Sequence, residues 1–169
     1  VIETGAGNDF VDAGEGNDVI HGGDGAGDDV YVGGVGDNTV VYPSTSEGIL
    51  VDLRLADRSE LAVSGADGGG PNPDTIGDLL AANSLDPDTL VGYAQGTEIG
   101  TDVLIDIQNA TGGAGDDIIH GNDNDNVLDG GADHDGVTTD NADELYGYGG
   151  NDTLTGGTGA DEVYGGDGD

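Results

Sequence analysis

The chain has 169 residues, of which 36 are Gly and 36 are Asp or Glu, against two arginines and no lysine. A formal net charge of −34 excludes nucleic acid as a partner, because a phosphate backbone would repel the chain. We also expect no membrane insertion, since the longest apolar run, residues 79–82, is far shorter than a membrane span. The absence of Cys excludes disulfides and thiolate-bound metals. Acidic chains with few aromatic residues are commonly disordered, so a folded state requires a source of positive charge.

Residues 1–41 contain a repeat of about nine residues. Each unit has a loop rich in Gly, an Asp or Asn at its sixth position, and a three-residue segment in which polar and apolar side chains alternate. That alternation predicts a short strand whose middle residue, the eighth of the unit, points inward. The inward residues of this first block are Ile2, Val11, Ile20, Tyr31 and Val40.

Residues 42–111 differ in composition, with all four prolines and both arginines of the chain. Apolar alternation predicts strands at 49–53 and 103–107, and the sequence pattern predicts a short helix at 75–83. We interpret this segment as an enlarged connection with flanking strands, joining two blocks of repeats, and not as a separate domain.

The repeat resumes in residues 112–169 and is interrupted near 132–140 by an insertion that must leave the stack of repeats. Its inward residues are Ile119, Leu128, Leu145, Leu154 and Val163. Both ends of the chain fall inside a unit, so we expect a piece of a longer repeat array.

Two units make one turn of a flattened helix, which stacks loops about eighteen residues apart. Stacked loops of carbonyl and carboxylate oxygens suit Ca²⁺, which accepts about six to eight oxygens in a flexible geometry. A core one side chain wide cannot offset the repulsion of this many carboxylates. We therefore predict a chain that is unfolded without calcium and folded with it.

The units resemble the haemolysin-type, or RTX, calcium-binding repeat, G-G-x-G-x-D-x-U-x, where U is apolar. Gly112–His120 and Gly156–Tyr164 match every fixed position of that pattern. The resemblance implies an all-β fold, a parallel β-roll or β-solenoid of nine-residue Gly/Asp repeats in two blocks. It also implies a secreted bacterial protein, extracellular or on the cell surface, that leaves the cell by type I secretion and folds on external Ca²⁺.

In the RTX family the ligands of several Ca²⁺ ions are the sixth-position carboxylate and loop carbonyls. The sixth positions here are Asp9, Asp18, Asp29, Asn38, Asp117, Asn126, Asp143, Asp152 and Asp161. Asn in place of Asp keeps an oxygen but loses the charge, so those two sites should be weaker. The implied carbonyl donors are Gly5, Gly7, Gly14, Gly16, Gly25, Gly27, Gly34, Gly36, Gly113, Gly115, Gly157, Gly159, Gly166 and Gly168.

The pattern predicts a calcium-binding structural module, with calcium ions and the rest of the parent chain as its partners. Two alternatives stay open: an adhesin or surface-layer segment with a cell-surface or host partner, and the accessory tail of a secreted enzyme. We predict no catalytic residues in this chain, because the repeat already explains most carboxylates as ligands. His21 and His120 occupy the outward ninth position, where they are expected to be exposed spacers.

Overall fold

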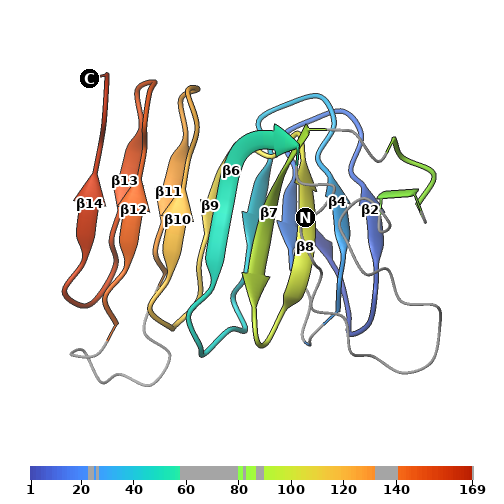
Figure 1. Ribbon diagram of the computed structural model, residues 1–169, viewed down its shortest axis with the longest axis horizontal. Coiled ribbons are helices and arrows are strands. Elements are labelled where there is room, and N and C mark those ends of the chain that lie inside the picture. Colours follow the sequence, from blue (N-terminus) through green and yellow to red (C-terminus); the bar gives the residue numbers. More distant parts are fainter. Residues whose placement is uncertain are drawn as a thin grey trace.

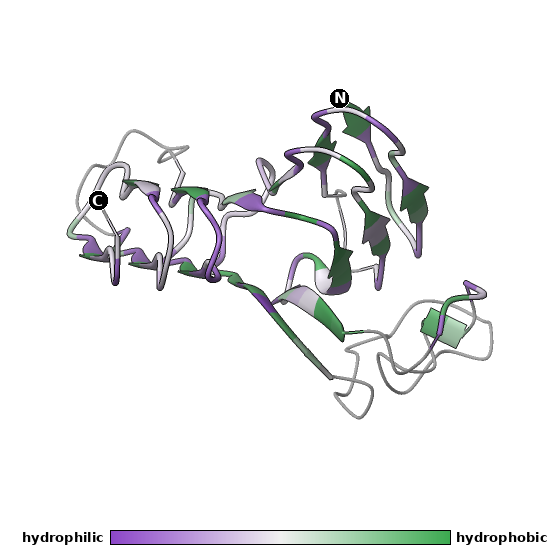
Figure 2. Cartoon of the chain, turned by 90° about the horizontal axis from the view of Figure 1, so that it is seen from above, coloured by the Kyte–Doolittle hydropathy of each residue, from purple (hydrophilic) through white to green (hydrophobic). Residues whose placement is uncertain are grey.

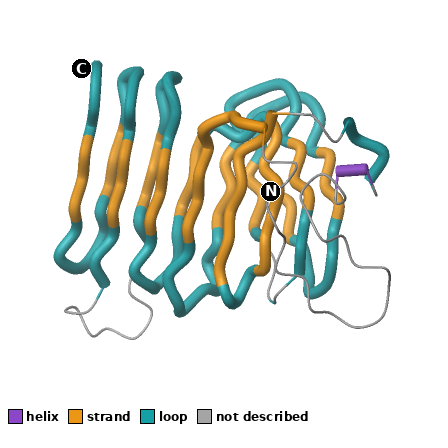
Figure 3. Tube along the Cα trace, viewed as in Figure 1, coloured by secondary structure: helices purple, strands orange, loops and turns teal. Residues whose placement is uncertain are grey.

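The computed structural model describes residues 1–22, 25, 27–57, 80–81, 83–86, 90–131 and 141–168. Those residues form strands joined by loops, and helix occurs in them only at residues 80–81, within the predicted 75–83 (Figure 3). The prediction of an all-β protein is confirmed. The strands are β1 (Ile2–Glu3), β2 (Phe10–Asp12), β3 (Val19–His21), β4 (Val30–Val32), β5 (Thr39–Val41), β6 (Leu50–Asp57), β7 (Leu90–Gly96), β8 (Gly100–Ile105), β9 (Asn109–Thr111), β10 (Ile118–His120), β11 (Val127–Asp129), β12 (Glu144–Tyr146), β13 (Thr153–Thr155) and β14 (Glu162–Tyr164).

Successive strands of the nonapeptide blocks alternate between two sheets (Figure 1). One sheet has six strands in the order β1-β3-β5-β9-β11-β13, and the other has eight in the order β14-β12-β10-β6-β7-β8-β4-β2. Neighbouring strands from the repeats are parallel and in register, so Ile20 lies between Ile2 and Val40. Each unit is too short to fold alone. In the blocks its strand pairs with the strands two units before and two units after it, which lie in the same sheet.

The core is the row of eighth-position side chains between the two sheets. Of the predicted inward residues, seven are buried: Val11, Ile20, Tyr31, Val40, Ile119, Leu128 and Leu145. Ile2 and Leu154 are partly buried, and Val163, in the last strand, is 46% exposed. The inward assignment is therefore confirmed along the stack and weakens at its ends, where no further strand covers the side chain.

The middle segment contributes strands to both sheets. Strands β6 and β8 overlap the predicted 49–53 and 103–107, whereas β7 and β9 have no counterpart in the sequence analysis. β7 runs antiparallel to both β6 and β8, so the eight-stranded sheet is mixed and not purely parallel. The predicted turn at residues 68–71 and the insertion at 132–140 lie outside the described residues.

The unequal strand counts bend the stack. Between β5 and β11 the smaller sheet holds one strand, β9, while the larger sheet holds three strands, β8, β7 and β6, between β4 and β10. Two extra strands at about 4.8 Å each lengthen one face by roughly 10 Å. Figure 2, seen from above, accordingly shows the stacks of strands of the first and second blocks extending in different directions, with the larger sheet on the outside of the bend.

A second apolar cluster lies on the outer face of this sheet. Val30, Val91 and Val103 are buried there under Leu80, with Leu85 packed against them. Leu80 and Leu85 therefore cover the part of the sheet that carries the antiparallel strand. No helix in the described part of the chain has the length and apolar character needed to cross a membrane.

Candidate metal-binding site

The Gly-rich loops stack directly on one another. A Cβ atom at Gly34 or Gly36 would collide with the carbonyl oxygen of Gly14 or Gly16 in the loop below. Both Gly34 and Gly36 also have positive φ, which side chains rarely tolerate. Glycine at these places thus lets each loop place its carbonyl oxygens close to the next loop.

Sixth-position side chains form a first row along one edge of the stack. The backbone N–H of Asp9 donates to Asp29 Oδ1 (2.7 Å), and that of Asp29 donates to Asp102 Oδ1 (3.2 Å). Each carboxylate therefore binds the coil before it. The other carboxylate oxygen of Asp29 and of Asp102 accepts a hydrogen bond from a buried phenol. Tyr31 donates to Asp29 Oδ2 (2.5 Å), and Tyr42 donates to Asp102 Oδ2 (2.8 Å).

The same row continues in the second block. The N–H of Ile49 donates to Asp117 Oδ1 (2.8 Å), that of Asp117 to Asp143 Oδ1 (2.8 Å), and that of Asp143 to Asp161 Oδ1 (3.2 Å). Asp117 Oδ2 also accepts from the N–H of Gly113 in its own loop (2.7 Å). Ile49 carries no ligand atom in its side chain, so the row has no carboxylate at the level of β6.

A second row runs along the opposite edge. The N–H of Asp18 donates to Asn38 Oδ1 (3.0 Å), that of Asn38 to Gln108 Oε1 (2.8 Å), and that of Asn126 to Asp152 Oδ1 (2.9 Å). Asn126 Nδ2 joins the two parts by donating to the carbonyl of Gln108 (2.7 Å). Carboxylates stand at the two ends of this row and amides in its centre.

Burial and mutual repulsion strain the carboxylates of the first row. Burial, helped by the charges of neighbouring carboxylates, raises the pKa of Asp117 to about 7 and that of Asp143 to about 6. Burial also raises the pKa of Asp29, where the charges of Asp9 and Asp28 add to the effect. It raises the pKa of Asp102 far above its usual value, where the charge of Asp29 adds to the effect. Ionised, these rows favour a cation beside them.

Two buried carboxylate oxygens indicate that calcium fits between the loops. Among the described residues, Asp18 Oδ2 and Asp152 Oδ2 are buried without a hydrogen-bond partner, which is costly for a charged oxygen. A cavity of about 170 Å³ lies beside Asp152 and is lined by glycines, Gly150, Gly165, Gly166 and Gly168. A carboxylate beside a cavity lined by glycine backbone offers hard oxygen donors, which suit Ca²⁺.

Nowhere in the described ranges do three or more Asp, Glu or His side chains gather to hold a metal by themselves. The rows supply one side-chain oxygen donor per coil, so an ion between coils needs backbone carbonyls to complete its coordination. This is the donor set that the resemblance implies. Of the implied carbonyl glycines, those with positive φ are Gly7, Gly14, Gly16, Gly25, Gly34, Gly36, Gly157, Gly159, Gly166 and Gly168.

The structure brings the nine predicted sixth-position residues into these two rows and adds members that the sequence analysis missed. Asp102 and Gln108 occupy sixth positions within the middle segment. Gly100 to Ile105 has the Gly, Asp and apolar spacing of the second half of a unit, so the signal for Asp102 was present without the leading glycines. Gln108 has no such signal.

A further set of side chains, at the fifth position, was also missed. Asn17 Oδ1 accepts from the N–H of Asp37 (3.1 Å), and Asp125 Oδ1 accepts from that of Asn151 (2.7 Å). These hydrogen bonds connect consecutive coils, as those of the sixth-position rows do. The preference for Asn or Asp at position five therefore has a structural reason of its own.

Comparison with known families agrees with this geometry. The model of the RTX calcium-binding nonapeptide repeat matches four times, at residues 1–26, 24–40, 107–137 and 137–169, which together make up more than half of the chain. No curated protein matches the chain significantly. RTX repeats bind several Ca²⁺ ions per array. Matching repeats in both blocks, on the loops that carry the two rows, show that the chain belongs to the RTX calcium-binding nonapeptide repeat family.

Proposed function

We propose that this chain is a calcium-dependent structural module of a secreted or cell-surface protein, which folds as a β-roll when it meets extracellular calcium after type I secretion. Membership of the RTX family supports calcium binding and a secreted parent protein. The observation that carries the calcium-dependent fold is the pair of rows of buried carboxylates. Rows of this kind destabilise a metal-free fold, because each buried carboxylate raises the cost of its neighbours.

The residues that would hold calcium are the sixth-position carboxylates and the loop carbonyls beside them. Asp18 and Asp152 are the strongest side-chain donors, since each has a buried oxygen without a partner. Bound calcium would neutralise the rows and contribute its binding energy to folding. The chain's own contribution is to hold the oxygens in place through glycine loops and the coil-to-coil hydrogen bonds.

The first test removes the ion. We expect EDTA to abolish the β-sheet signal in circular dichroism and millimolar Ca²⁺ to restore it. A sheet signal that persists in EDTA would overturn the calcium-dependent fold.

The second test addresses individual ligands. Asp152→Asn should lower calcium affinity at least tenfold, roughly the loss that even outer-shell partners cause. Asp12→Asn is the matched control, because Asp12 is exposed at the outward ninth position. Equal losses for the two variants in a calorimetric titration would contradict the assigned register.

We further propose that the chain itself carries no catalysis and that any enzymatic activity of the parent protein resides elsewhere. The carboxylates in the rows bond to backbone N–H groups of neighbouring coils, which supports a structural role for them. An adhesive role is a second proposal, favoured by the stacked rings of His120, Tyr146 and Tyr164 on the outer face of the larger sheet.

A further inference from the structure

Two carboxylates of the first row are bonded to tyrosines of the core. Asp29, Asp102, Tyr31 and Tyr42 are all buried, and the two phenols donate to the Oδ2 atoms of the two carboxylates. Both Oδ1 atoms accept backbone N–H groups of the row, so each carboxylate has both oxygens bonded within the protein. We call these four residues the phenol-capped pair.

Elsewhere in the first row the second carboxylate oxygen points into a glycine loop. Asp9 Oδ2 accepts from the N–H of Gly5 (3.3 Å), and Asp117 Oδ2 accepts from the N–H of Gly113 (2.7 Å). Each of these bonds lies within one unit, whose loop also carries the carbonyl oxygens that an ion between coils needs. In the phenol-capped pair, the corresponding oxygen bonds to a phenol instead.

Tyr42 stands where the repeat pattern has a glycine. It directly follows the unit Gly33–Val41, in the place of the first residue of the next unit. Its ring packs so closely on Gly22 that a Cβ atom there would lie 2.2 Å from the ring carbon Cε1. The ring therefore occupies space inside the stack that a glycine would leave open.

Tyr31 departs from the pattern at the eighth position. Every other predicted inward residue is aliphatic, so Tyr31 alone brings a hydroxyl group into that row. This hydroxyl lies 2.5 Å from Asp29 Oδ2 and 3.2 Å from Thr4 Oγ1. The substitution therefore places a hydrogen-bond donor beside the one carboxylate of its own unit that would face an ion.

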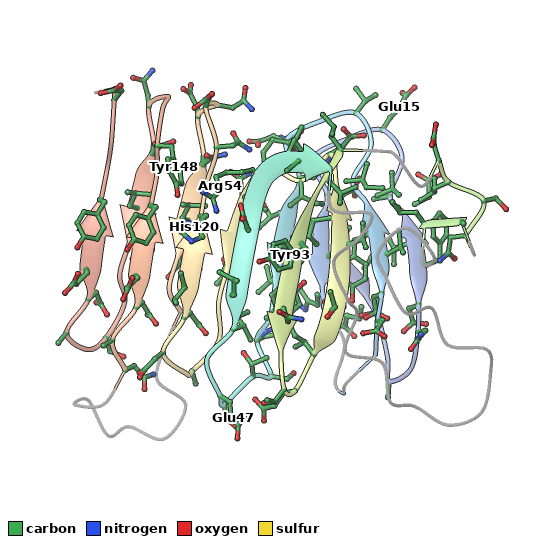
Figure 4. All side chains as sticks on the ribbon, in the orientation of Figure 1. Glu15, Glu47, Arg54, Tyr93, His120 and Tyr148 are labelled. Carbon is green, nitrogen blue, oxygen red and sulfur yellow. The ribbon has the colours of Figure 1, made fainter. Side chains whose placement is uncertain are left out.

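The chain before Asp102 is a hairpin turn and not a glycine loop. It joins β7 to β8, and Thr97 and Glu98 stand where the pattern has its first two glycines. Glu98 Oε2 accepts from the N–H of Ser46 (2.5 Å) and of Glu47 (2.9 Å). Thr97 also donates to Glu47, which lies beside this turn in Figure 4. The turn is thus bonded to the neighbouring loop by side chains.

We propose that the two phenols of the phenol-capped pair take the place of calcium, so that these two coils are held by hydrogen bonds without an ion. This inference rests on the proposed function and specifies which sixth-position carboxylates are not ligands. It removes Asp29 from the ligands that the family resemblance implies. The ions of the first row then lie on either side of the phenol-capped pair, and the two tyrosines are positioning residues that divide the row.

The first experiment counts bound ions by calorimetric titration with Ca²⁺. Asp29→Asn and Asp102→Asn should keep the wild-type number of ions, because neither carboxylate is a ligand. An amide keeps the oxygen that accepts the backbone N–H, so both variants preserve the bond between coils. Asp152→Asn is the comparison and should weaken calcium binding at least tenfold. A lost ion, or a loss of affinity as large as that of Asp152→Asn, in either variant would overturn the inference.

The second experiment removes the hydroxyl groups and keeps the rings. Tyr31→Phe and Tyr42→Phe each leave a buried carboxylate oxygen without its donor, so we expect a lower midpoint of urea unfolding in saturating calcium. Tyr164→Phe is the matched control, because Tyr164 also donates to a carboxylate, that of Glu162, but is 48% exposed. If the phenols only fill space, all three variants will unfold at the wild-type midpoint, and the inference is wrong.

Failure of this inference and failure of the proposed function give different results. A wild-type chain that binds no calcium would overturn the proposed function and this inference with it. A wild-type chain that binds calcium, and loses an ion in Asp29→Asn or Asp102→Asn, would overturn the inference alone. Circular dichroism in saturating calcium is recorded first on every variant. If an Asn variant does not fold, the Phe variants decide.

Discussion

At the scale of single residues, amides at the sixth position make hydrogen bonds that carboxylates cannot make. Asn38 Nδ2 donates to the carbonyls of Gly34 (3.3 Å) and Asp106 (3.0 Å). Asn126 Nδ2 donates in the same way to the carbonyl of Gln108. The amide hydrogens thus satisfy carbonyl oxygens that would otherwise face a cation. We therefore expect a coil with Asn in this position to depend less on calcium than a coil with Asp.

This contrast predicts the effect of Asn38→Asp. The new carboxylate loses the donor and faces two carbonyl oxygens, so the coil should need calcium that the wild type does not. We expect folding to require a higher calcium concentration and the calorimetric stoichiometry to rise by about one ion, because an added carboxylate strengthens a hard-oxygen site.

Asn17→Asp is the control for that change. Asn17 is exposed and uses only its oxygen, which Asp also supplies, so its calcium dependence should match the wild type. The amide interpretation fails if the two variants behave alike.

The buried carboxylates also predict a pH dependence. The pKa values of Asp117 and Asp143 in the fold, about 7 and about 6, lie above the ordinary 3.8. Without calcium the folded chain therefore binds protons more tightly than the unfolded chain, and its stability falls as the pH rises from about 4 to about 7. In EDTA we expect more β-structure by circular dichroism at about pH 5 than at about pH 8.

With calcium in place of EDTA, we expect more β-structure at the higher pH than at the lower one, because calcium competes with protons for the same oxygens. Asp117→Asn should reduce the difference between the two pH values in EDTA. A β-structure content in EDTA that does not change with pH would contradict this account.

At the scale of elements, the sequence predicted the periodic strands and largely missed the others. Eighth-position residues such as Ile20 and Leu128 could be placed because the loops before them fix the register. β7 could not, because its order depends on pairing with β6 and β8, and its own residues, from Leu90 to Gly96, alternate weakly. The rows were predictable where Asp recurs, and not at Gln108, whose place follows from the tertiary position of β9.

Leu80 tests the role of the segment that covers β7. Its side chain is fully buried against Val30, Val91 and Val103. Leu80→Ala should lower the free energy of unfolding by about 2–5 kcal/mol, measured by urea unfolding in saturating calcium. Leu90→Ala removes the same atoms from a side chain that is 53% exposed and should cost much less. Similar losses would mean that the packing of Leu80 does not stabilise the sheet.

At the scale of the whole molecule, the net charge of −34 has two parts with different responses to salt. Repulsion between exposed carboxylates is screened over about 8 Å at physiological ionic strength, whereas the buried rows are screened much less. We therefore expect NaCl in EDTA to compact the unfolded chain without restoring β-structure, and CaCl₂ of equal ionic strength to restore it. Small-angle scattering with circular dichroism measures both quantities. Folding by NaCl alone would show that surface repulsion, and not the buried rows, opposes the fold.

The uncharged centre of the second row has a consequence for the order of folding. Asn38, Gln108 and Asn126 join the two blocks through hydrogen bonds that need no ion, and Ile49 leaves the first row uncharged at the same level. In repeat proteins folding can begin at one place and spread to neighbours. The central coils are therefore the expected nucleus, from which each block grows outward, one coil and its calcium at a time. Kinetics of refolding on calcium addition should then show the centre protected from hydrogen exchange before either end.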